Sequence, residues 1–105
     1  MNVKTVDVTT AKQWLDKKQA ILIDVREPAE YASQKIAGAA LHPVGSISVN
    51  SIPQTDKKIL IYCQKGARGS NACQKLMTEN VELEVYNIEG GIDAWHQAGL
   101  LTESS

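Results

Sequence analysis

Three runs of apolar residues divide the chain and predict buried β-strands at residues 20–25, 58–63 and 83–88. The runs are nearly continuous, which is typical of parallel strands that are covered on both faces. Residues 39–44 give a weaker fourth strand, and residues 4–8 give an edge strand. The pattern therefore predicts a central, mainly parallel, five-stranded sheet.

Between these runs, apolar residues recur at helical spacing. Residues 10–13 are typical of a capping box that opens a helix, and Pro28 suits the first turn of a short helix through Tyr31. One more helix follows the 58–63 strand, and a last helix is expected to end at Gly99. The inward-facing residues of the three longer helices are Ala11, Trp14 and Leu15; Ala72, Cys73, Leu76 and Met77; and Ile92, Trp95 and Ala98.

This alternation of strands and helices predicts an α/β fold with helices on both faces of the sheet. At 105 residues, the whole chain (1–105) is expected to form a single domain. Residues 46–55 indicate a long connection, and residues 101–105 indicate a flexible tail.

Composition narrows the class of protein. Hydrophobic residues make up 43 % of the chain, and a net charge of -1 argues against nucleic acid as the partner. No apolar run approaches the ~20 residues that cross a bilayer, so we expect no membrane contact by this domain. Two cysteines give neither a disulfide framework nor a zinc site, which favours reducing, cytoplasmic surroundings. We expect neither a metal nor a cofactor.

Cys63 ends the second apolar run and precedes a short loop that leads into a helix. At the carboxyl end of a parallel strand, backbone N–H groups and the helix dipole favour a thiolate and an anion beside it. Lys65 and Arg68 add positive charge to the same loop, and Gly66 allows close approach of the backbone to a ligand. The sequence therefore predicts a nucleophilic thiolate that attacks an anionic substrate.

Other readings of the cysteines and histidines are less favoured. Cys73 lies on the inward face of its helix and is expected to be structural, so a redox pair with Cys63 is disfavoured. His42 and His96 match no arrangement typical of a cysteine protease, and we interpret both as structural or solvated. Two substrate classes remain from the residues alone: a sulfane-sulfur oxyanion, or a phosphate or arsenate ester.

Asp24 and Arg26 lie at the carboxyl end of the 20–25 strand. A carboxylate and a guanidinium there are expected to form a hydrogen-bonded network that fixes neighbouring loops. We favour structural support over catalysis for this pair.

Three stretches resemble signatures of the rhodanese-homology family of sulfurtransferases. They are residues 23–31 (IDVREPAEY) continuing to Pro43, residues 63–69 (CQKGARG) and residues 86–95 (YNIEGGIDAW). They occur in the family's order and cover essentially the whole chain. The chain most resembles small single-domain bacterial members, and also the rhodanese domain of inner-membrane proteins.

The resemblance implies a single rhodanese-like domain in which Cys63 is the catalytic residue. Cys63 would take the outer sulfur of a small anionic donor such as thiosulfate and become a persulfide. A thiophilic acceptor, cyanide in vitro or a thiol such as thioredoxin or glutathione in the cell, would then take that sulfur. The substrate-binding residues implied are Gln64, Lys65, Gly66, Ala67, Arg68 and Gly69.

Two positions depart from the family pattern. Residues 34–39 read QKIAGA where Gly-His-Ile-Pro-Gly-Ala is usual, and Gly69 stands where serine is common. Related phosphatases and arsenate reductases have five residues between cysteine and arginine, whereas residues 64–67 separate Cys63 from Arg68 here. The shorter loop favours sulfur transfer, and the intact Cys63 argues against an idle sensing or docking module. We expect a monomer in the cytoplasm, or the cytosolic domain of a longer inner-membrane protein.

Overall fold

The structure is a computed structural model that describes residues 3–104. Its central sheet has five strands in the order β1-β6-β5-β2-β4, and every neighbouring pair is parallel. The predicted five-stranded parallel sheet is confirmed. The strands are β1 Lys4–Val6, β2 Ala20–Asp24, β4 Ala40–Leu41, β5 Lys58–Tyr62 and β6 Val85–Ile88.

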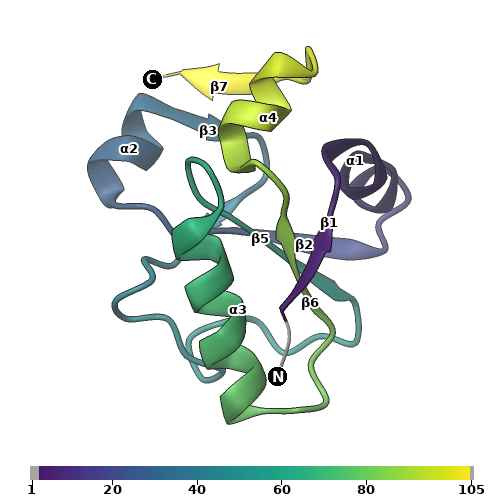
Figure 1. Cartoon of the computed structure of the whole chain (residues 1–105), viewed down its shortest axis with the longest axis vertical. Helices are drawn as coiled ribbons and strands as arrows, with labels where there is room; N and C mark the ends of the chain where they lie inside the picture. The colour runs from purple at the N-terminus through teal and green to yellow at the C-terminus, as the bar shows by residue number, and fades with distance from the viewer. Residues whose placement is uncertain (1–2, 105) are drawn as a thin grey trace.

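In the part of the chain that the structure describes, four helices cover both faces of this sheet (Figure 1). They are α1 Val8–Asp16, α2 Pro28–Ser33, α3 Ala67–Glu79 and α4 Gly91–Gln97. Residues of α1 and α4 pack in one apolar cluster, whereas α3 packs in another together with residues of the 44–52 connection. The predicted α/β architecture, with helices on both faces, is confirmed.

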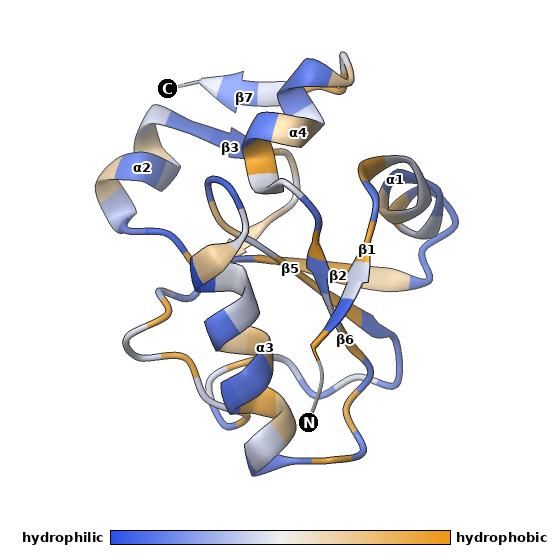
Figure 2. Ribbon diagram, viewed as in Figure 1, coloured by the Kyte–Doolittle hydropathy of each residue, from blue (hydrophilic) through white to orange (hydrophobic). Residues whose placement is uncertain are grey.

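The central strand β5 explains why the apolar runs are continuous. Leu60 and Tyr62 belong to the cluster with α1 and α4, while Ile59 and Ile61 belong to the cluster with α3. All four side chains are at most 1 % exposed. Both faces of the strand are therefore core, which leaves no polar alternation in the sequence. Figure 2 shows apolar residues along the central strands and many hydrophilic residues on helices and loops.

Two details of the helix predictions are wrong. The first helix begins at Val8, because the Asp7 carboxylate accepts a hydrogen bond of 2.7 Å from the Thr10 N–H and caps the helix before the predicted box. The reciprocal capping box lies instead at the start of α2, between Glu27 and Glu30. Ala98 is exposed because α4 ends at Gln97 and Ala98 is its C-cap.

The predicted flexible tail is also wrong for the residues described. The strand β7 (Thr102–Ser104) pairs antiparallel with β3 (Gln34–Ile36), and the two lie side by side next to α2 and α4 (Figure 1). The Trp95 indole N–H donates to the Leu101 carbonyl at 3.0 Å and ties the end of the chain to α4. Ser105 lies outside the described residues. Among residues 3–104, no helix combines the length and the apolar character that crossing a bilayer requires.

Candidate active site

Cys63 directly follows β5, and its sulfur lies inside a loop of backbone amides. Its Sγ accepts hydrogen bonds from the N–H of Gly66 at 3.0 Å and the N–H of Gly69 at 3.2 Å. Cys63 is 1 % exposed, and α3 begins at Ala67 within the same loop. Amides at a helix N-terminus have no partner inside the helix, so they are available to negative charge on the sulfur.

Two glycines shape this loop. Gly66 has a φ of 131°, a region that L side chains rarely adopt, and it provides the turn before α3. Gly69 is buried in the first turn of α3, where a Cβ would overlap Asn87 Oδ1 and lie 3.1 Å from Asn87 Cγ. The serine common in the family at this position would meet Asn87 as the side chain is placed here.

Asn87, on β6, holds the loop by a side-chain hydrogen bond. Its Nδ2 donates to the Gly66 carbonyl at 3.0 Å, and the residue is only 5 % exposed. Its Oδ1 is buried without a hydrogen-bond partner among the described residues. Sequence reasoning missed this residue, although an amide inside the apolar run of β6 is the signal that could have found it.

Backbone N–H groups at the start of α4 also hold the loop. The N–H groups of Ile92 and Asp93 donate to the carbonyls of Cys63 and Gln64, at 2.9 and 3.2 Å respectively. Gly91 has a φ of 60°, and a Cβ there would lie 2.6 Å from the Gln64 carbonyl oxygen. Only glycine lets the two backbones approach this closely.

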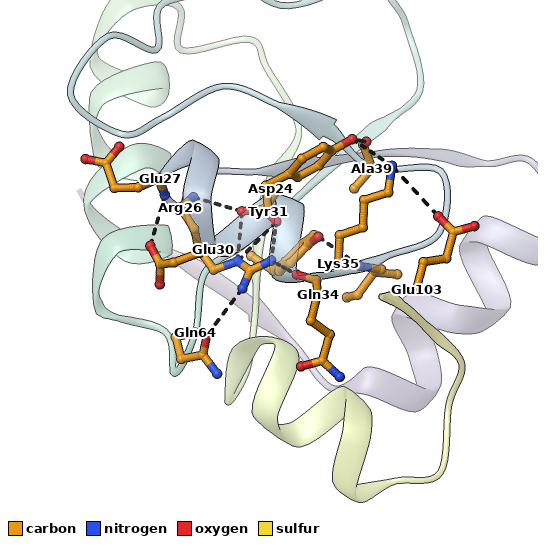
Figure 3. A network of polar contacts seen from close by, with 12 residues as sticks. Asp24, Arg26, Glu27, Glu30, Tyr31, Gln34, Lys35, Ala39, Gln64 and Glu103 are labelled. Atoms are coloured by element: carbon orange, nitrogen blue, oxygen red, sulfur yellow. Dashed lines mark hydrogen bonds and ion pairs between the residues drawn. The ribbon is translucent and has the colours of Figure 1, made fainter. Parts of the chain in front are cut away.

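Asp24 and Arg26 form the buried pair predicted from the sequence. Arg26 is 2 % exposed and Asp24 0 %, and the guanidinium contacts both carboxylate oxygens at 2.8 to 3.1 Å. Burial acts to lower the pKa of Arg26, but the hydrogen bond and charge of Asp24 outweigh it, so the pKa is raised. The guanidinium also donates to the Gln34 carbonyl at 2.5 Å, which ties the segment after β2 to β3 (Figure 3).

Gln64 links this pair to the loop and to α4. Its Oε1 accepts a hydrogen bond from Arg26 at 3.3 Å (Figure 3), and its Nε2 donates to Asp93 Oδ1 at 2.5 Å. The side chain of Gln64 therefore faces the supporting network. An open depression of ≈ 430 Å³ lies beside it, lined by Arg26, Ala29, Glu30, Ser33, Gln34 and Gln64.

Arg68, expected to face an anionic donor, is paired with Glu30 on α2. Its two terminal nitrogens contact the two oxygens of the Glu30 carboxylate at 2.7 and 3.0 Å. The Arg68 hydrogen bond is the largest influence that lowers the pKa of Glu30 to about 2, and the same pair raises the pKa of Arg68. Lys65 is exposed and makes no ion pair within residues 3–104. Sequence reasoning missed Glu30.

The other residues considered from the sequence are Ala67, the two histidines and Cys73, and none of them is hydrogen-bonded to the Cys63 sulfur within residues 3–104. Ala67 is exposed at the start of α3, and His96 is exposed on α4. The His42 backbone N–H donates to the Asp24 carbonyl at 2.9 Å, and neither imidazole is hydrogen-bonded to Cys63 in the described part of the chain. Burial, followed by the charge of Cys63, raises the pKa of Cys73 to about 12, so this thiol stays neutral inside the core. Among the residues that the structure describes, the hydrogen bonds to the Cys63 sulfur therefore come from backbone amides and not from a histidine.

Sequence comparison places this site among proteins of one family. Residues 7–98 match the model of the rhodanese-like domain. The chain is 34 % identical over 102 residues to a Vibrio cholerae protein named thiosulfate sulfurtransferase GlpE, a match that covers 95 % of this chain and 94 % of that protein. It is 37 % identical over 99 residues to an uncharacterized Synechocystis protein, covering 93 % of this chain but only 55 % of the relative.

Structure comparison agrees. The rhodanese-like domain of an Anabaena protein, solved by NMR in solution, superimposes with a TM-score of 0.85 at 25 % identity. The match covers 96 % of this chain and 79 % of that one. The chain thus belongs to the rhodanese-like domain family.

Proposed function

We propose that this domain is a thiosulfate sulfurtransferase that works through a persulfide on Cys63. The observation that carries the proposal is the pair of N–H groups, from Gly66 and Gly69, that donate to the Cys63 sulfur. The relatives named as sulfurtransferases support the same activity. No histidine contacts the sulfur in the described part of the chain, and this reaction needs no general base.

In the first half of the reaction, the Cys63 thiolate attacks the outer sulfur of thiosulfate. A bond forms between the two sulfurs, the bond from the outer sulfur to the sulfonate sulfur breaks, and sulfite leaves with its electron pair. The negative charge moves from Cys63 to the terminal persulfide sulfur, and no proton is transferred. Fixed amides stabilise such a charge because they do not have to reorganise as it forms.

In the second half, an acceptor nucleophile attacks the terminal sulfur of the persulfide. Cyanide would form thiocyanate and regenerate the Cys63 thiolate, and a thiolate acceptor would leave as its own persulfide. We propose thioredoxin or glutathione as the acceptor in a cytoplasmic, monomeric protein. These reducing surroundings suit a free thiol nucleophile.

The loop length favours sulfur over phosphorus chemistry. Residues 64–67 are all that separate Cys63 from Arg68, and Cys63 is 1 % exposed. A loop this tight suits the single outer sulfur of a donor better than the tetrahedral head of a phosphate ester. We therefore propose sulfur transfer and not hydrolysis of a phosphate ester.

The test combines activity with mass measurement. The wild-type domain, mixed with thiosulfate and cyanide, should form thiocyanate, and thiosulfate alone should add one sulfur atom to the peptide that carries Cys63. Cys63→Ala should abolish both. Cys73→Ala, a buried cysteine outside the loop, is the matched control and should retain most of the activity. Hydrolysis of aryl phosphates without thiocyanate formation, or sulfur on the Cys73 peptide alone, would overturn the proposal.

A further inference from the structure

The charge of Arg68 is already neutralised before any donor arrives. Glu30 binds both terminal nitrogens of the guanidinium, and about a third of each side chain is exposed (35 % and 33 %). With a pKa of about 2, Glu30 stays ionised throughout the range in which a cytoplasmic protein works. The ion pair is therefore present across the neutral pH range in which the activity is assayed.

In the described part of the chain, no other charged pair near the loop replaces the positive charge of Arg68 that Glu30 neutralises. The charges of Arg26 and Asp24 cancel each other, because the two side chains form a buried ion pair. Of the two positive charges that Lys65 and Arg68 bring to the loop, Glu30 pairs with that of Arg68, and Lys65 is left as the loop cation that makes no ion pair within residues 3–104. A dianion such as thiosulfate meets half the positive charge that the loop sequence offers.

We propose that Glu30 is a specificity-determining residue, which holds Arg68 away from the donor and reduces the advantage of dianionic over monoanionic sulfane donors. The inference rests on the proposed sulfurtransferase activity and deepens it. The donor to compare with thiosulfate is a monoanion with a terminal sulfane sulfur. An alkyl thiosulfonate is an example, since it loses a sulfinate where thiosulfate loses sulfite.

The Glu30 carboxylate also has a structural role, which the experiment has to separate from its effect on donor specificity. Glu30 Oε1 also accepts the Glu27 N–H at 3.0 Å, in the capping box of α2. Glu30 further offsets the unfavourable position of Arg68 near the N-terminus of α3. Loss of the contact with the Glu27 N–H would affect all donors equally, because it alters the fold and not the charge that the donor meets. A change that scales with donor charge is therefore the diagnostic readout.

The experiment compares thiosulfate with methanethiosulfonate in wild type and Glu30→Gln, each assayed by thiocyanate formation. Glutamine keeps an oxygen that can accept the Glu27 N–H, while it removes the charge and replaces one of the two oxygens that contact Arg68 by an NH2 group. Electrostatic energy scales with donor charge, so we expect kcat/KM to rise about threefold per negative charge, which gives about tenfold for thiosulfate and about threefold for methanethiosulfonate. The difference should shrink as salt is added.

Glu27→Gln is the matched control. It removes one negative charge from the same end of α2 but from a side chain that does not pair with Arg68. Its effect on the ratio between the two donors should be smaller than that of Glu30→Gln. The double variant Glu30→Gln with Arg68→Gln restores one net positive charge and should return the donor ratio to the wild-type value. It also provides the test if the single variant does not fold.

The outcomes separate the two proposals. No thiocyanate from wild type with either donor would overturn the proposed function itself. Activity in wild type, together with an equal change for both donors in Glu30→Gln, or a double variant whose ratio departs from wild type, would overturn the specificity role alone.

Discussion

Replacing Gly69 by alanine tests whether Asn87 holds the loop around Cys63. A Cβ at residue 69 would overlap Asn87 Oδ1, and the Asn87 amide has little room to move. It is 5 % exposed and tied to the Gly66 carbonyl by a hydrogen bond of 3.0 Å. To admit the methyl group, the amide has to rotate away and release Gly66, whose own N–H contacts the Cys63 sulfur.

The size of the effect follows from three contributions. Overpacking of a buried site costs about 1–3 kcal/mol, and the lost hydrogen bond costs about 1 kcal/mol. Alanine in a helix recovers about 1 kcal/mol relative to glycine. Gly69→Ala should therefore lower the free energy of unfolding by about 2 kcal/mol in the wild-type background.

The assay is a double-mutant cycle by urea unfolding of wild type, Gly69→Ala, Asn87→Ala and the double variant. Without the Asn87 amide, Gly69→Ala should cost nothing or stabilise slightly, which gives a coupling of about 2 kcal/mol or more. The rate of Cys63 alkylation should change in Gly69→Ala, because the loop amides that bond the sulfur are displaced. An equal cost of Gly69→Ala in both backgrounds would refute the reasoning.

Three further predictions concern the Arg26–Asp24 pair, the Glu30–Arg68 pair and the strand β7. Arg26→Met should lower the free energy of unfolding by about 3–5 kcal/mol in urea titrations, since it leaves the Asp24 carboxylate buried and unpaired; a loss below about 1 kcal/mol would contradict this. The depressed pKa of Glu30 should stabilise the fold at pH values above its usual 4.5 and lose that contribution as the pH falls toward 2. Because Glu30 is one-third exposed, the stability difference between wild type and Glu30→Gln should be only about 1 kcal/mol at neutral pH and vanish near pH 2. Deletion of residues 102–105 should lower Tm by a few degrees, roughly the effect of 1 kcal/mol, whereas an unstructured tail would leave Tm unchanged.

The strands and the Cys63 loop could be predicted because their signals are local. A strand with both faces buried has to be continuously apolar, and a thiol between a strand and a glycine-containing turn is visible without knowing the fold. The order β1-β6-β5-β2-β4 then places the carboxyl ends of β2, β5 and β6 together, so Asp24, Cys63 and Asn87 lie along one edge.

Contacts between distant residues could not be predicted in the same way. Glu30 and Arg68 are 38 positions apart, and nothing in either local sequence indicates that they meet. The strand β7 was missed because its residues are partly or fully exposed, so they carry no apolar alternation. Its pairing with β3 depends on the Trp95 anchor and on the position of α2, which only the folded chain provides.

Three groups outside the loop around Cys63 hold it in place by hydrogen bonds. Asn87 fixes the Gly66 carbonyl, Ile92 fixes the Cys63 carbonyl, and Arg26 fixes the side chain of Gln64. The groups that contact the sulfur are backbone N–H groups, which every residue except proline supplies, whereas the groups that hold the loop lie outside it: the side chains of Asn87 and Arg26 and the backbone N–H of Ile92. Stabilisation by fixed dipoles depends on their being held before charge develops. The proposed chemistry of the site should therefore depend on Arg26 after β2, on β6 and on α4 at least as much as on the exposed side chains of the loop.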